Sequence, residues 1–409
     1  MSRPSLFRRI FASAPEQRAL GPELSALFGA APTAAGPSVT PETALRSPST
    51  LAAVRIISEA VGSLPIHLYE RGAGNDRARD KDHPAARLLA GDWTPWASAS
   101  EVRTALQVDA LLHGFGAAQV VRAGSVPREL HRLDPRSVSI EIDDASGEPR
   151  FRVHLKQGGD RFLDWRDVLY VATPGSSYGR PLALIQLCRE AIGVDLVMQE
   201  HAARLFANGA RPSGLLKMGK PLGVEALKRL RDSWNAAHGG GPNAGRTAIL
   251  EDGVSFEALQ FTSTDLQFLE LRRFASEEIA RAFRVPPTLI GDLQRATWRN
   301  AEEMGRQFLQ FCLLPWLEVW QGALERALLT PEEREERFVE FIVDDLLRAD
   351  TAARFQAYRN AVGGSWLTAN EARALDNRPP IEGGDRLLRQ AGQTDSSGDD
   401  RNEPRDGSA

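Results

Sequence analysis

The chain has 409 residues, of which 42% are hydrophobic, and its 50 Lys and Arg residues against 54 Asp and Glu residues give a net charge of −4. This length is ample for two or three domains, or for one elaborate subunit. The charge excludes a generally basic coat for nucleic acid, because affinity for phosphate scales with the number of cations presented. Cys188 and Cys312 stand far apart in the sequence, so we expect no disulfide framework, no cysteine metal site and a reducing compartment.

The first residues lack the sustained apolar core of a signal peptide, and charges interrupt the longest apolar runs. We therefore expect a soluble protein with no membrane contact. Residues 1–44 are rich in Ala, Pro, Gly and Ser without periodicity, which predicts a flexible arm. Residues 389–409 carry many acids and no apolar anchor, which predicts a disordered tail.

The pattern over residues 45–181 predicts an α+β domain. Apolar residues recur at three- and four-residue steps from Leu51 to Val61, which predicts a helix capped by Ser49. A second helix is expected over 100–112. Alternation of apolar and polar residues, bounded by turn residues, predicts antiparallel strands at 66–69, 117–122, 138–142, 151–155, 161–163 and 168–172.

Two long helices, predicted over 182–208 and 265–283, flank a small βαββ unit. The first has almost no helix breakers, and the second opens with Thr264 and Gln267 at capping-box spacing. The unit between them has predicted strands at 214–218, 247–251 and 256–260, and a helix at 224–237. Helices this long need neighbours along their length, and a closed ring of identical subunits supplies such neighbours.

The sequence VPP at 285–287 ends the second long helix. A loop is expected over 288–300, followed by a third long helix over 301–329 with a kink at Pro315. The remaining predicted elements are a strand at 337–343 and short helices at 351–362 and 368–376.

Two motifs suggest enzymes. Residues 240–247 (GGPNAGRT) nearly match a phosphate-binding loop, but here a helix precedes the loop and a strand follows it, the reverse of the required order.

Residues 175–179 (GSSYG) match a nucleophile elbow, so a serine hydrolase that uses Ser177 stays open as the alternative. Against it, the only later histidines are His201 and His238, and the triad base normally follows well after the serine. The seven histidines form no pair at ligand spacing. We therefore expect no metal, no cofactor and no enzyme.

Several segments in one order resemble the bacteriophage portal proteins of the Hong Kong 97 type, a family that includes the portals of gene transfer agents. Together they run from about residue 47 to residue 385. They are 206–214 (FANGARPSG), 243–246 (NAGR), 250–253 (LEDG), 265–270 (DLQFLE), 278–287 (EIARAFRVPP), 300–303 (NAEE), 367–373 (LTANEAR), 379–380 (PP) and 383–385 (GGD).

The resemblance implies a structural protein that forms a ring, usually a dodecamer, at one capsid vertex of a phage virion or gene transfer agent particle assembled in the bacterial cytoplasm. Double-stranded DNA would pass through it during packaging and ejection. The implied partners are the major capsid protein, the large terminase subunit and the head–tail connector, or adaptor, protein. The implied parts are a wing (45–181), two stem helices (182–211 and 263–285), a clip (212–262), a tunnel loop (286–300), a long kinked helix with a wing strand (301–349) and a crown (350–388).

The same resemblance points to two sets of site residues. A tunnel loop would face the DNA with Asp292, Gln294, Arg295, Thr297 and Arg299. The clip would present a docking surface with Lys228, Arg231, Asn243 and Arg246. A near-neutral chain suits a conduit, because a strongly cationic lining would trap a polyanion. We expect Arg295 and Arg299 to touch phosphates without reading bases; a salt bridge from Arg299 to Glu302 or Glu303 is the open alternative.

Overall fold

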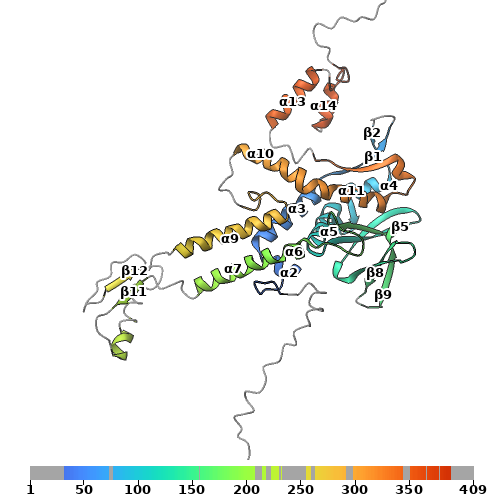
Figure 1. Cartoon of the computed structure of the whole chain (residues 1–409). Coiled ribbons are helices and arrows are strands. Elements are labelled where there is room, and N and C mark those ends of the chain that lie inside the picture. The colour runs from blue at the N-terminus through green and yellow to red at the C-terminus, as the bar shows by residue number, and fades with distance from the viewer. Residues whose placement is uncertain are drawn as a thin grey trace, which may run out of the picture. The chain divides into compact units, whose positions relative to one another are not determined.

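The computed structural model describes residues 32–72, 77–155, 157–207, 214–217, 223–229, 232, 255–258, 263–291, 298–343, 351–364, 366–376 and 378–387. The chain divides into two compact units, one ending at Phe341 and the other beginning at Ile342. Helices and strands are mixed in the first unit, and the described residues of the second form two helices (Figure 1). The fold is therefore α+β, as expected.

Two helices, α3 (Pro48–Ser63) and α5 (Ala99–His113), pack closely in the first unit. A Cβ at Gly62 of α3 would lie 1.9 Å from the Thr104 Oγ1 on α5, so only glycine permits this approach. The predicted cap of α3 is wrong, because the Ser47 hydroxyl accepts the Thr50 N–H at 3.2 Å. Pro48 takes the first helical position, where a missing N–H costs nothing.

Helix α5 lies on an antiparallel sheet of order β10–β5–β6, made of Val168–Ala172, Phe115–Ala123 and Val126–Leu133. Gly116 lets the strand approach the helix, since a Cβ there would lie 2.2 Å from the Leu106 carbonyl oxygen. A second antiparallel sheet, of order β7–β8–β9, shares a core of Phe115, Phe151 and Tyr170 with the first. Its strands are Val138–Ile142, Pro149–His154 and Asp160–Asp164.

A third sheet joins residues far apart in the sequence. Its order is β13–β1–β2, and β1 (Ile66–Arg71) pairs antiparallel with β13 (Arg337–Phe341), with Leu68 opposite Val339. The expected late strand therefore closes onto the first domain. The remaining short elements near these sheets are β2 (Arg77–Arg79), α4 (Pro84–Ala90), β3 (Asp92–Thr94), β4 (Ala97–Ser98) and α12 (Glu333–Glu336).

The first long helix is broken, contrary to the prediction. It consists of α6 (Leu184–Leu187) and α7 (Arg189–Ala207), and Cys188 between them departs from helical geometry, with φ −108° and ψ 21°. Tertiary contacts hold α6 separately, because the Gln186 side chain donates to the Val39 carbonyl at 2.8 Å. Helix α9 (Ser263–Ala282) starts before the predicted cap, so Thr264 lies inside it.

The third long helix is interrupted by a π-helical segment, Phe308–Leu313, between α10 (Trp298–Gln307) and α11 (Leu314–Leu328). This segment lies just before Pro315, where the sequence predicts a kink. Proline has no N–H for the carbonyl four residues earlier, and a wider turn just before it accommodates that loss. Since α10 begins at Trp298, the loop predicted over 288–300 ends earlier than expected.

The predicted flexible arm is partly ordered, because Thr33 and Ala34 contact α7 and residues 41–44 form a short helix. Thr33 is buried beside Gly193, where a Cβ would lie 2.5 Å from the Thr33 Oγ1. The Ala34 N–H donates to the Glu190 carboxylate at 2.8 Å. A capping box at Thr40 then starts the short helix α2 (Pro41–Ala44). The sequence missed this order because glycine on the partner helix, and not periodicity in the arm, creates the site.

The second unit contains α13 (Thr351–Gly363) and α14 (Ala369–Leu375), and a buried Asn370 organises it. The Asn370 amide donates to the Ile381 carbonyl at 3.0 Å and to the Asp385 carboxylate at 2.8 Å. Its oxygen accepts the Ile381 N–H at 2.8 Å. The backbone N–H of Asn370 donates to the Gly384 carbonyl at 2.9 Å. One side chain thus fixes the segment that follows α14.

We expect Asn370→Asp to loosen this segment. The change removes both amide donors and sets a carboxylate against Asp385, so the loss is roughly 2–3 kcal/mol. Hydrogen exchange at the Ile381 amide measures it, and Asn360→Asp on the exposed face of α13 is the matched control. Equal protection of that amide in both variants would contradict the assignment.

Candidate functional site

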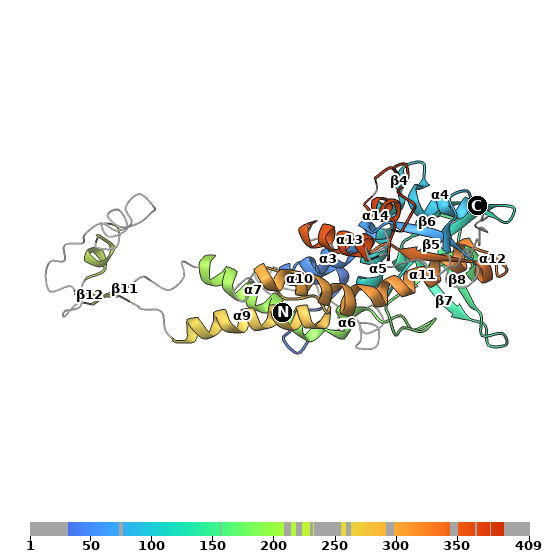
Figure 2. The same cartoon turned by 90° about the horizontal axis from the view of Figure 1, so that it is seen from above.

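Helices α7 and α9 run side by side (Figure 2). The rings of His201 on α7 and Phe268 on α9 lie 5.4 Å apart. Ala275 and Ile279 of α9 are buried on its inner side. Ser49 of α3 donates a hydrogen bond to Ser276 at 2.9 Å, which ties α9 to the body of the unit. The inner face of α9 is therefore fully used within the subunit.

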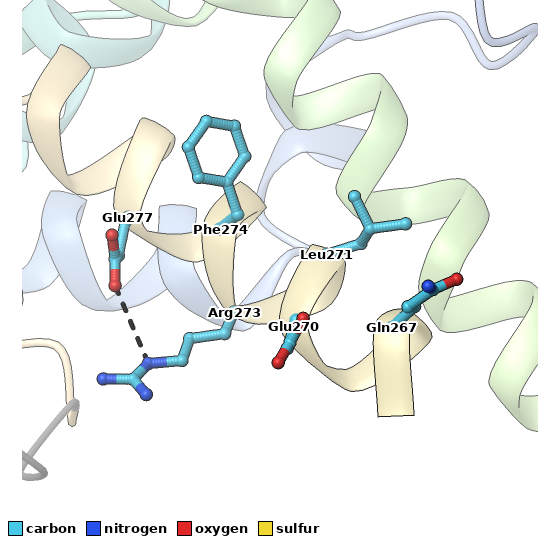
Figure 3. Close-up of a pocket in the computed structure, with 6 residues that line it drawn as sticks. All are labelled: Gln267, Glu270, Leu271, Arg273, Phe274 and Glu277. Carbon is cyan, nitrogen blue, oxygen red and sulfur yellow. Dashed lines mark ion pairs between the residues drawn. The ribbon is translucent and has the colours of Figure 1, made fainter. Parts of the chain in front are cut away.

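The outer face of α9 exposes large apolar side chains. Leu271 is 59% exposed and Phe274 is 50% exposed. They lie in an open hollow of about 560 Å³, and the described residues lining it all come from α9 (Figure 3): Gln267, Glu270, Leu271, Arg273, Phe274 and Glu277. An ion pair of 3.6 Å joins Arg273 to Glu277 along its edge. An apolar patch with a charged rim is typical of a protein interaction surface.

Helix α9 ends in a Schellman motif centred on Arg284. The Val285 N–H donates to the Ala280 carbonyl at 2.9 Å, and the Arg284 N–H donates to the Arg281 carbonyl at 3.1 Å. Arg284 itself has φ 57°, in the left-handed region. Tight turns then carry the chain from Pro286 to residue 291. The double proline thus ends the helix as predicted, through a fixed and well-bonded turn.

The predicted site residues lie largely outside the described residues. In the tunnel loop only Arg299 is described, as part of α10, and its side chain is not. In the clip Lys228 is exposed on a helical segment over 224–229. Near it in sequence, β11 (Gly214–Lys217) pairs antiparallel with β12 (Ser255–Ala258). The predicted residues outside the description are Asp292, Gln294, Arg295, Thr297, Arg231, Asn243 and Arg246.

The turn at 175–179 lacks the features of a nucleophile elbow. The backbone of Ser177 forms an isolated antiparallel β-bridge with that of Arg180, and the next helix begins only at Leu184. The Ser176 hydroxyl accepts the Leu182 N–H at 3.0 Å, so it serves the turn. His201 faces Phe268 on α9, and His238 lies outside the described residues. The hydrolase alternative gains no support.

The described parts of the chain contain no candidate metal site and no candidate membrane-spanning helix. Within them, no group of three or more His, Cys, Asp or Glu side chains is placed to hold a metal ion. A search of the same residues finds no helix with the length and hydropathy needed to span a membrane. The two cysteines are unbridged, and burial raises the pKa of each thiol to about 12.

Comparison with known proteins decides the family. The family model described as "Phage portal protein" matches residues 48–377. The chain belongs to the phage portal protein family. The portal protein of Enterobacteria phage HK97 is 30% identical over 366 residues, which cover 87% of this chain and 84% of that protein. The probable portal protein of Streptomyces phage phiC31 is 29% identical over 370 residues, covering 86% and 79%.

A solved structure shows the same fold. It is a chain in the neck of an empty gene transfer agent particle, computed with C6 symmetry. It is 25% identical, with a TM-score of 0.62, and the match covers 88% of this portal chain and 99% of the other. The predicted portal fold is therefore confirmed. The match to the family model runs from α3 into the second unit, where Asn370 of the LTANEAR segment donates a hydrogen bond to Asp385 of the GGD segment.

Proposed function

We propose that this portal chain assembles into a closed ring of twelve copies at one vertex of a phage or gene transfer agent particle. The outer face of α9 carries the proposal, because Leu271 and Phe274 remain exposed on a helix whose inner face is already buried. In a ring, each copy covers this face of its neighbour. The C6 symmetry of the similar particle neck supports a ring, and twelve is a multiple of six.

The parts of the chain take the roles that the family resemblance implies. Residues 45–181 and β13 form the wing, α6, α7 and α9 the stem, residues 212–262 the clip, and residues 350–388 the crown. The clip, with Lys228 on its surface, docks the terminase and later the head–tail connector. The wing faces the major capsid protein. This role is structural and not catalytic, and the match to the phage portal protein family supports it.

Double-stranded DNA passes through the ring during packaging and ejection. The loop over 286–300 narrows the channel, and Arg295 and Arg299 contact phosphates without reading the sequence. Assembly takes place in the bacterial cytoplasm, and the finished ring resides in the particle. The near-neutral charge of the chain supports this role, because weak attraction lets the duplex slide.

Negative-stain microscopy of the purified full chain tests the proposal. We expect rings with a central hole that admits duplex DNA, and light scattering should give the mass of twelve copies. The hydrolase alternative predicts compact monomers whose esterase activity disappears in Ser177→Ala. Monomers at every concentration tested, without rings in particles, would contradict the ring proposal.

A further inference from the structure

Arg284 occupies a backbone position that favours glycine. It is the only non-glycine residue with positive φ in the described part of the chain, and the other positive-φ positions there are glycines. An L-residue in the left-handed region costs roughly 1–2 kcal/mol, and the residue that closes a Schellman motif is usually glycine for this reason. The turn itself therefore does not require arginine. We look for the role of Arg284 in its side chain.

The base of this side chain is rigid. Phe283 and Val285 on either side are both 2% exposed, while Arg284 is exposed. The Cys312 thiol of the π-helical segment donates to the Phe283 carbonyl at 3.4 Å, which anchors the turn from below. Burial raises the pKa of the Cys312 thiol, and the positive charge of Arg284 acts against that rise. A fixed backbone thus presents an exposed cation to solvent.

The guanidinium of Arg284 has no carboxylate within its own subunit among the residues described. Neither Arg284 nor Arg281, one turn earlier, has an ion-pair partner in the part of the chain that the structure covers. Arg273 engages Glu277, the acid four residues before Arg281. The segment from Val285 to residue 291 carries no charge at all. The end of α9 therefore offers two cations just where the chain enters the proposed channel loop.

We propose that Arg284 binds the phosphate backbone of duplex DNA inside the ring. This inference rests on the proposed function, which places the start of the loop in the channel. The planar guanidinium matches phosphate through two parallel hydrogen bonds, and such contacts position DNA without reading bases. One arginine in each copy gives a belt of cations at a single height. The backbone strain at φ 57° is what this belt costs each subunit.

The Arg284→Gly variant tests the assignment, because stability and DNA binding should move in opposite directions. Glycine relieves the left-handed strain, so the melting temperature of the full chain should rise. Rings of the variant should bind a fluorescein-labelled duplex about tenfold more weakly at low salt. The slope of log affinity against log salt should become shallower by about 0.9 for each phosphate that the variant no longer neutralises. Arg284→Lys keeps the charge but not the two parallel hydrogen bonds, so it should keep the salt slope of wild type and bind with an affinity between wild type and the glycine variant.

A matched control is Arg128→Ala, which removes an exposed arginine from β6 in the wing and should leave the affinity for the duplex unchanged. Arg284→Gly rings that bind the duplex as tightly as wild-type rings would overturn this inference and leave the proposed ring intact. Loss of rings in Arg284→Gly would also overturn it, since the guanidinium would then pair with a neighbouring copy. Wild-type chains that form no ring would overturn the proposed function and this inference together.

Discussion

A chain with Phe274 changed to glutamate should fold like wild type and fail to form rings. Phe274 is already half exposed in the subunit, so the change removes little from the core. In the proposed ring the half of the Phe274 side chain that is exposed in the single subunit becomes buried. This burial contributes roughly 2 kcal/mol to the binding free energy of each interface. Glutamate there loses this term and lies near Glu270 and Glu277 on the same face. Repulsion and desolvation at every interface then add up around the closed ring.

The effect of Phe274→Glu is read from two measurements. Circular dichroism and a thermal melt should match wild type, while light scattering and microscopy should show monomers. Phe162→Glu on β9 is the control, because Phe162 is 53% exposed and lies outside α9. That variant should still form rings. Intact rings in Phe274→Glu at wild-type concentration would rule out the outer face of α9 as the contact between copies.

Local periodicity predicted most elements of the first unit, because helices and strands there bury one face each. The strands at 138–142 and 168–172 agree with β7 and β10 to the residue. Strand β6 was missed, because Pro127 and four charged or histidine positions within VPRELHRL hide its alternation. Its place is fixed by pairing with β5, which no local pattern reveals. Tertiary pairing, and not intrinsic propensity, defines that strand.

The candidate site was only partly accessible to sequence reasoning. The long helices were predicted, and their length suggested packing between copies. Which face of α9 stays exposed depends on where α3 and α7 lie against it, and contacts such as Ser49 with Ser276 are long-range. The left-handed backbone of Arg284 is also hidden, because an arginine before Val-Pro-Pro indicates only an ordinary helix end. These properties emerge only when distant segments meet.

Arg103→Met should destabilise the first unit by roughly 3–5 kcal/mol. Arg103 is 4% exposed, and no carboxylate pairs with it among the residues described. Its guanidinium instead donates to three carbonyls: Gly62 at 2.7 Å, Leu64 at 3.1 Å and Leu89 at 3.2 Å. These lie at the carboxyl ends of α3 and α4, where unpaired carbonyls and the helix dipoles concentrate negative charge. Burial lowers the pKa of Arg103 to about 10, which still leaves it charged at neutral pH.

Methionine fills a similar volume and leaves all three carbonyls buried without donors, each at a cost of about 1–3 kcal/mol. Arg103→Lys keeps the charge, but one ammonium cannot reach carbonyls spread across two helix ends, so an intermediate loss is expected. Urea unfolding followed by near-ultraviolet circular dichroism measures both. Arg55→Met, which removes an exposed arginine paired with Glu59 on α3, should shift stability by less than about 0.5 kcal/mol. If Arg103→Met and Arg55→Met unfold at the same urea concentration, helix ends without donors are tolerated here, and Arg103 does not join α3 to α4.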